Sequence, residues 1–195
     1  MGKIIAVANQ KGGVGKTTSA MNLGAGLSAA GKKVLMIDLD PQASLTLSMG
    51  FQTPDQIETT VTDIMSRIVN DREPAFECGI QHISGTLDLL PSNIDLSATE
   101  VSLVNAMSRE LILRTYMEYI REAYDYIIID CMPSLGILTI NALACADSVL
   151  IPVQAAYLPV KGLQQLIKTI YTVKRRLNNA LSIEGILFTM VDRRT

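Results

Sequence analysis

The stretch from residue 6 to residue 18, AVANQKGGVGKTT, constrains the fold more than any other part of the chain. The apolar run Ile4–Ala8 is typical of a buried strand, and the residues from Lys16 onward favour a helix. A glycine-rich turn between a strand and a helix is the setting of a phosphate-binding loop. Its glycines let backbone N–H groups surround a polyphosphate, and the positive end of the helix points at the same anion. We therefore predict a loop that binds nucleotide phosphates rather than an ordinary turn.

The side chains of this loop have separate expected roles. Lys16 is expected to reach the outer phosphates, and the Thr17 hydroxyl to bind a magnesium ion. The loop departs from the common pattern G-x-x-x-x-G-K-[ST], because Gln10 replaces the first glycine and a second lysine, Lys11, follows it. The predicted nucleotide-binding residues are Lys11, Gly12, Gly13, Val14, Gly15, Lys16, Thr17 and Thr18.

Length and composition limit the classes of protein to which this chain can belong. With 195 residues, 48% of them hydrophobic, the chain suits one globular domain over residues 1–195. No apolar run is long enough to cross a bilayer and no signal peptide precedes the first strand, so we expect a cytoplasmic protein without a membrane partner. Three widely spaced cysteines and one histidine do not have the spacing of a zinc site.

Apolar runs and helical periodicities alternate along the chain, which predicts an α/β fold with a doubly wound, mostly parallel sheet of the P-loop NTPase type. We expect Gly24 and Gly26 to let the first helix approach the sheet, and Gly31 to end it. Because little chain follows the last strand, we also expect a domain shortened at its C-terminus. After Ile4–Ala8, strands are predicted at 34–37, 87–90, 126–130, 148–153 and 184–191, and helices at 16–30, 61–68, 97–123 with a break near Ser108, 136–146 and 160–178.

Carboxylates follow two of the predicted strands. Ligands of open α/β sheets bind at the carboxyl ends of the strands, where Asp38, Asp40 and Asp130 stand. Asp130, after four apolar residues, suits the Walker B role of holding magnesium. Asp40 is our candidate for orienting the attacking water in a hydrolysis reaction. The predicted metal-binding residues are Thr17, Asp40 and Asp130, and the predicted catalytic residues are Lys11, Lys16 and Asp40.

Five stretches together resemble the Soj/ParA type of chromosome- or plasmid-partitioning ATPase, a branch of the ParA/MinD superfamily with a deviant Walker A loop. The resemblance implies ATP and Mg²⁺ as cofactors, a homodimer around two nucleotides, and Lys11 crossing the interface to the partner's nucleotide. It also implies the roles stated above for Lys16, Thr17, Asp40 and Asp130, and a DNA contact for Arg194. The stretches are ANQKGGVGKTT, IDLDPQ, YIIIDC-x-PSLG, PVQ and TMVD-x-RT.

Some positions depart from the family pattern. Ala43 and Ser44 replace the usual glycine and asparagine of D-P-Q-G-N, and Met132 replaces the first proline of D-C-P-P. Ala156 and Lys161 stand where acidic residues are common. The family's C-terminal proline–asparagine pair, which helps to recognise adenine, has no match in this sequence.

Basic residues gather in the last quarter of the chain. Residues 148–195 hold seven basic and two acidic residues, although the whole chain has a net charge of −2. Lys161, Lys168 and Arg175 recur every seven residues and so share one face of the predicted helix. A solvated face is the common meaning of such a pattern, but Arg193 and Arg194 and the family resemblance favour contacts to DNA phosphates.

The resemblance therefore implies an ATP-dependent DNA-partitioning switch located on the nucleoid. The ATP-bound dimer would bind DNA without sequence preference, and slow hydrolysis stimulated by a ParB-type centromere-binding protein would release it. One alternative is a MinD-like membrane-associated positioning ATPase. A second is a metabolic or electron-transfer enzyme with the same loop, such as a relative of the nitrogenase iron protein.

Overall fold

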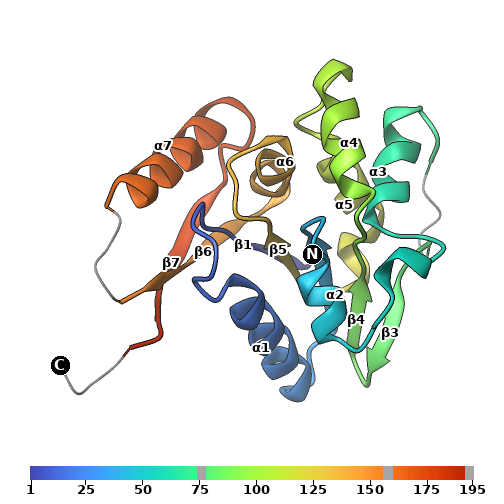
Figure 1. Ribbon diagram of the computed structural model, residues 1–195, viewed down its shortest axis with the longest axis horizontal. Coiled ribbons are helices and arrows are strands. Elements are labelled where there is room, and N and C mark those ends of the chain that lie inside the picture. Colours follow the sequence, from blue (N-terminus) through green and yellow to red (C-terminus); the bar gives the residue numbers. More distant parts are fainter. Residues whose placement is uncertain (74–77, 156–159, 192–195) are drawn as a thin grey trace.

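The computed structural model describes residues 1–73, 78–155 and 160–191, with the backbone alone at 160 and 161 (Figure 1). Seven strands form one sheet in the order β3-β4-β2-β5-β1-β6-β7. Every neighbouring pair is parallel except β3 and β4, which form an antiparallel hairpin. The predicted α/β fold with a mostly parallel sheet is confirmed. The strands are β1 Lys3–Val7, β2 Val34–Leu39, β3 Gln81–Ser84, β4 Leu87–Leu90, β5 Tyr126–Cys131, β6 Ser148–Gln154 and β7 Ser182–Thr189.

Helices cover both faces of the sheet (Figure 1). The five helices α3 to α7 pack on one face, and α1 with the short α2 packs on the other. Because side chains alternate along a strand, β1 contributes Ile4 and Ala6 to the first core. It contributes Ile5 and Val7 to the second. The helices are α1 Lys16–Ala29, α2 Ser44–Ser48, α3 Val61–Val69, α4 Leu96–Ser102, α5 Ile112–Ile120, α6 Ile137–Cys145 and α7 Val160–Arg176.

The first helix follows the prediction closely. It ends at Ala29, and Gly31 just beyond it has a φ of +79°, a conformation that favours glycine. A side chain at Gly24 would press against the Met36 sulfur 2.6 Å away, so glycine is needed there for close approach to β2. Gly26 faces open space, and its predicted role in that approach is wrong. No helix in the described ranges is long and apolar enough to cross a membrane.

The structure corrects the prediction in the middle of the chain. The sequence did not indicate β3 or α2, because both are short and the burial of β3 alternates with polar, exposed residues. The break predicted near Ser108 is confirmed, with a φ of +49° at that residue. Val101 and Val104, two residues of the helical pattern before the break, lie on the surface rather than in the core.

The last strand differs from the others in its burial. β7 is an edge strand that pairs with β6 alone, and its residues alternate little between buried and exposed. Phe188 is 58% exposed and Ile186 is 47% exposed. β7 therefore presents apolar side chains to solvent, whereas β1, β2 and β5 lie inside the sheet with almost fully buried residues.

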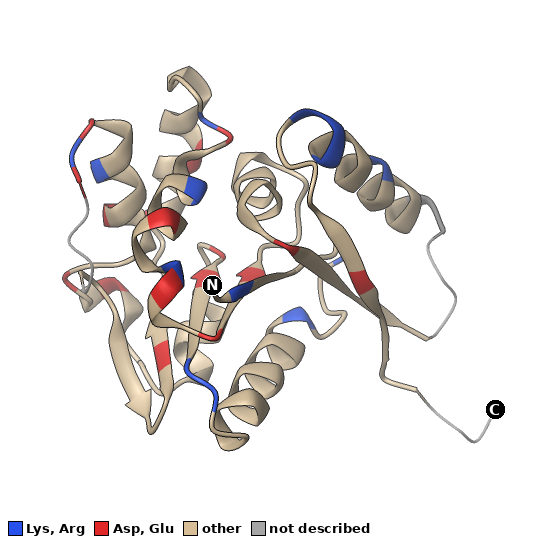
Figure 2. Cartoon of the chain, turned by 180° about the vertical axis from the view of Figure 1, so that it is seen from behind, with Lys and Arg blue, Asp and Glu red and all other residues tan. Residues whose placement is uncertain are grey.

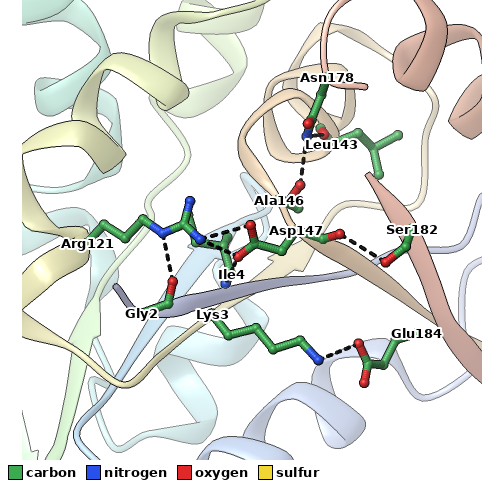
Figure 3. Close-up of polar contacts among 10 residues, drawn as sticks. All are labelled: Gly2, Lys3, Ile4, Arg121, Leu143, Ala146, Asp147, Asn178, Ser182 and Glu184. Atoms are coloured by element: carbon green, nitrogen blue, oxygen red, sulfur yellow. Dashed lines mark hydrogen bonds and ion pairs between the residues drawn. The ribbon is translucent and has the colours of Figure 1, made fainter. Parts of the chain in front are cut away.

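Polar contacts hold the amino edge of the sheet, where the parallel strands begin (Figure 3). Arg121 donates from Nη2 to both carboxylate oxygens of Asp147, at 2.7 and 2.8 Å, and from Nε to the Gly2 carbonyl at 2.7 Å. Asp147 also accepts from the Ile4 N–H at 2.8 Å, and its carbonyl accepts from the Ser182 N–H and hydroxyl. One arginine and one aspartate thus connect the beginnings of β1 and β7 and the segment before β5.

Candidate functional site

The carboxyl ends of three central strands lie side by side. In the parallel register, Asp130 at the end of β5 pairs with Val7 of β1 on one side and Asp38 of β2 on the other. The loop that follows β1 therefore lies beside both carboxylates. This is the edge of an open α/β sheet at which ligands bind.

The loop between β1 and α1 adopts the conformation that its glycines permit. Gly13 and Gly15 have φ angles of +70° and +83°, where a side chain would be strained. At Gly12 and Gly13, an added Cβ would meet no atom within 4 Å, so there is open space beside this part of the loop. The helix starts directly at Lys16, without an acidic residue in its first turn. Its unpaired N–H groups and positive dipole end suit an anion.

The Lys16 side chain reaches back from the start of α1 to the loop. It is 7% exposed, and its Nζ donates to the Lys11 carbonyl at 3.1 Å. Burial lowers the pKa of Lys16, while the nearby Asp130 and Asp40 carboxylates oppose that shift. The ammonium group thus lies between the loop and the carboxylates, where it can neutralise the outer phosphates of a nucleotide.

Asp130 and Thr17 fit a magnesium ion. Asp130 is 1% exposed, and within the described chain its Oδ1 is buried without a hydrogen-bond partner. Burial raises the pKa of Asp130 to about 7, although a hydrogen bond from Thr17 and the charge of Lys16 oppose the rise. A carboxylate oxygen that lacks a protein donor, beside a hydroxyl and a phosphate loop, is a donor set that Mg²⁺ prefers. The residues present therefore fit a magnesium–nucleotide complex.

The two aspartates after β2 have different environments. Asp38 is fully buried, and its Oδ2 accepts from the Thr46 N–H at 2.8 Å and the Thr46 hydroxyl at 2.7 Å. Burial raises the pKa of Asp38 to about 6. Asp40 is half-buried, and in the described chain its carboxylate accepts only from the Gln42 N–H, at 3.0 Å. Asp38 therefore anchors α2, whereas Asp40 remains accessible to a ligand or a water molecule.

Thr46 is a residue that the sequence analysis did not single out. Besides its bonds to Asp38, its hydroxyl accepts from the Ser92 N–H at 3.0 Å. The preceding turn holds Ala43 at a φ of +50°, where the family pattern has glycine. An alanine in this left-handed region is strained by roughly 1–2 kcal/mol. The segment that carries Asp40 is thus pinned at Asp38 and strained at Ala43.

Asn9 and Lys11 connect the loop to the end of β6. Asn9 was not predicted as a site residue, although an Asn directly after a strand is a known turn signal. Its Nδ2 donates to the Pro152 carbonyl at 2.7 Å, and its Oδ1 accepts from the Lys11 N–H at 3.0 Å. The exposed Lys11 side chain lies 3.4 Å from Gln154 Oε1 of its own chain. Asn9 therefore braces the loop, and among the described residues the Lys11 side chain has a single long, solvent-exposed contact.

Two of the five predicted DNA-binding residues, Lys168 and Arg175, lie in the described part of the chain with their side chains. Both side chains are exposed on α7, a helix on which Figure 2 shows basic and no acidic residues. The opposite face of α7 is apolar and buried at Leu166, Ile170 and Val173, which are at most 3% exposed. The side chain of Lys161, and Arg193 and Arg194 entirely, fall outside the described residues.

Comparisons with known proteins agree with this geometry. A family model described as an AAA domain matches residues 2–183. The sporulation initiation inhibitor protein Soj of Bacillus subtilis is 49% identical over the whole chain, which spans 75% of that relative.

Solved structures are similar as well. A Mycobacterium smegmatis protein described as cobyrinic acid a,c-diamide synthase, bound to ADP and magnesium, is 39% identical with a TM-score of 0.92; the match covers all of this chain and 77% of that one. A plasmid partition protein from Borrelia burgdorferi is 31% identical with a TM-score of 0.84, over 100% and 82% of the two chains.

Proposed function

This chain belongs to the Soj/ParA family of chromosome-partitioning ATPases, and on that premise we propose that it is an ATP-driven switch in DNA segregation. The observation that carries the proposal is the meeting of Lys16, Thr17 and the unpaired Asp130 oxygen at one edge of the sheet. A phosphate loop, a hydroxyl and a buried carboxylate are what binding of magnesium and ATP requires. The sequence resemblance predicted this set.

Each residue of the site has a role in nucleotide binding and hydrolysis. The amides of the loop and Lys16 bind the phosphates, while Thr17 and Asp130 hold the cation. When bound, Mg²⁺ withdraws charge from the phosphate oxygens. Asp40 orients the water that attacks the γ-phosphorus and accepts its hydrogen bond. A new oxygen–phosphorus bond forms as the bond to the β–γ bridging oxygen breaks, which gives ADP and phosphate.

Lys11 is the residue that connects the two subunits of the proposed switch. Its side chain is exposed and, in the described ranges, is held by one 3.4 Å contact to Gln154, so it can leave that contact at low cost. In the proposed homodimer each Lys11 reaches the phosphates bound by the partner, and nucleotide becomes part of the interface. ATP then favours the dimer by binding it more tightly than the monomer.

DNA is the proposed partner of the dimer. Lys168 and Arg175 face solvent on α7, and no acidic residue stands between Asp147 and Glu184. Such a surface attracts phosphates without reading base sequence. We place the protein on the nucleoid in the cytoplasm, where a ParB-type centromere-binding protein stimulates hydrolysis and so releases the dimer.

Co-sedimentation with DNA tests this proposal. The protein is mixed with DNA of unrelated sequences in the presence of ATP, ADP or no nucleotide, with Asp40→Ala included to prolong the ATP state. We expect ATP-dependent binding to every sequence, weakened by salt. Replacing Lys168 and Arg175 by alanine should weaken it, whereas replacing the exposed Lys32 and Lys33, which lie between the end of α1 and β2, should not. DNA binding that is equal with ATP, with ADP and without nucleotide would contradict the proposed switch.

Two further experiments test the alternative functions. Anionic phospholipid vesicles in place of DNA test a MinD-like membrane ATPase. Because one structural neighbour is described as cobyrinic acid a,c-diamide synthase, ATP turnover with and without cobyrinic acid tests a metabolic role. ATP-dependent binding to vesicles but not DNA, or turnover that requires cobyrinic acid, would replace the proposed function.

A further inference from the structure

We infer that Thr189, the last residue of β7, is a positioning residue that orients the phosphate loop, an inference that rests on the proposed nucleotide binding. Its hydroxyl donates to the carbonyl of Val14, in the middle of the loop, at 2.8 Å. The two residues are 175 positions apart in the sequence. This hydrogen bond joins the loop to the edge strand of the sheet.

The backbone of Thr189 is held in place by β6. Thr189 pairs in register with Gln154 of β6, and its carbonyl accepts from the Ala155 N–H at 3.1 Å. The chain turns immediately afterwards, since Met190 has a φ of +53°. Pairing with β6 therefore holds the Thr189 backbone, and with it the hydroxyl donor, independently of the loop.

The bond controls the direction of one peptide group. Val14 is 1% exposed, so its carbonyl would be costly to leave unpaired. In a trans peptide the C=O and the following N–H point in opposite directions. A Val14 carbonyl held toward β7 thus turns the Gly15 N–H away from β7, and no hydrogen bond among the described residues uses that N–H. Gly15 precedes Lys16, where the helix begins and phosphate is expected.

The methyl group of Thr189 lies next to the loop. A Cβ placed on Gly15 would be 3.6 Å from the Thr189 methyl carbon, an ordinary van der Waals distance. Thr189 therefore borders the loop at Gly15 as well as donating to Val14. Asn9 braces the start of the loop from β6, and Thr189 braces its middle from β7.

Conservative variants separate the hydroxyl from the methyl group. Thr189→Val keeps the shape and removes the donor, whereas Thr189→Ser keeps the donor and removes the methyl. The matched control is Thr115→Val, because Thr115 is also half-buried and donates to a backbone carbonyl, that of Leu111, at 3.3 Å. Binding of a fluorescent, non-hydrolysable ATP analogue with Mg²⁺ is measured for each, together with thermal unfolding and hydrogen–deuterium exchange of residues 8–20 without nucleotide.

Loss of one neutral hydrogen bond should weaken binding about fivefold in Thr189→Val. Thr189→Ser and Thr115→Val should stay within about twofold of the unsubstituted chain, and only Thr189→Val should speed exchange in residues 8–20. If Thr189→Val does not fold, Thr189→Ala carries the same expectation. Equal affinity in the valine variant, or equal loss in the serine variant, would overturn the inference alone. Failure of the unsubstituted chain to bind the analogue would overturn the proposed function as well.

Discussion

The amino edge of the sheet, where the parallel strands begin, and the carboxyl edge, where they end, differ in how their charged side chains are paired. At the amino edge, the Arg121 and Asp147 side chains bind each other and two backbone groups, the Gly2 carbonyl and the Ile4 N–H (Figure 3). At the carboxyl edge, Asp130 has an unpaired buried oxygen and a raised pKa, and Lys16 has a lowered pKa. Buried charges without full partners destabilise a fold unless a ligand completes them. The amino edge therefore stabilises the fold, and the carboxyl edge is prepared for a ligand.

Lys16→Ala should have the largest effect at the carboxyl edge. We expect loss of detectable ATP binding, more than about 100-fold, because the outer phosphates lose their counter-ion inside the loop. Fluorescent-analogue titration measures this. The matched control is Lys3→Ala at the amino edge, where the 2.7 Å ion pair to Glu184 is exposed. Equal affinity in Lys16→Ala and Lys3→Ala would remove the distinction between the edges.

Lys11→Ala should abolish ATP-dependent dimerisation while leaving ATP binding by the monomer largely intact. The reason is that Lys16 already neutralises phosphate within the subunit, whereas Lys11 is free to cross an interface. Light scattering in an Asp40→Ala background, which prevents turnover, measures the dimer. An ATP-dependent dimer that survives the substitution would exclude the role in trans.

Asp40→Ala should slow hydrolysis roughly 100-fold without weakening ATP binding, since a group that orients water acts in the transition state. Phosphate release and analogue titration measure the two quantities. Asp38→Ala is the contrasting variant, because Asp38 anchors Thr46 and its loss should lower the midpoint of thermal unfolding. Unchanged turnover in Asp40→Ala would remove that residue from the mechanism.

Arg121→Ala tests the amino edge. It should lower the free energy of unfolding by about 2–3 kcal/mol, because Asp147 and the Gly2 carbonyl lose partly buried partners. Nucleotide affinity of the folded protein should not change. Urea unfolding with and without Mg²⁺-ATP measures both. A variant that unfolds normally but binds nucleotide poorly would show that the edges are coupled.

The last prediction concerns the nucleotide-free chain, whose stability Asp130→Asn should change by an amount that depends on pH. The pKa of Asp130 is raised from 3.8 to about 7, so between those values the folded state binds more protons than the unfolded state. Stability of the nucleotide-free chain should therefore fall as pH rises from 5 to 8. In chelator, Asp130→Asn should flatten this dependence, so that the variant gains stability at pH 8 relative to pH 5. An unchanged pH profile would contradict the raised pKa of Asp130.

The sequence predicted the site best where chemistry is local. The loop at 6–18 needs glycine at positive φ, a lysine and a hydroxyl in consecutive positions, and its strand and helix are where they were expected. It predicted less well where the signal is short or polar, as for β3 and α2. Val101 and Val104 show the same limit, since helical spacing does not say which face meets the sheet.

The sequence by itself determined the fold class, the phosphate loop and the set of carboxylates, because period, glycine placement and strand ends are properties of neighbouring residues. Only the tertiary structure decided which aspartate is structural. Asp38 and Asp40 are two residues apart, and the difference arises from Thr46, which the fold brings onto Asp38. The contact of Thr189 with Val14 likewise depends on β6 bringing β7 to the loop. Hydrogen bonds between distant residues form only after the strands are ordered, and for this reason no local sequence pattern predicts them.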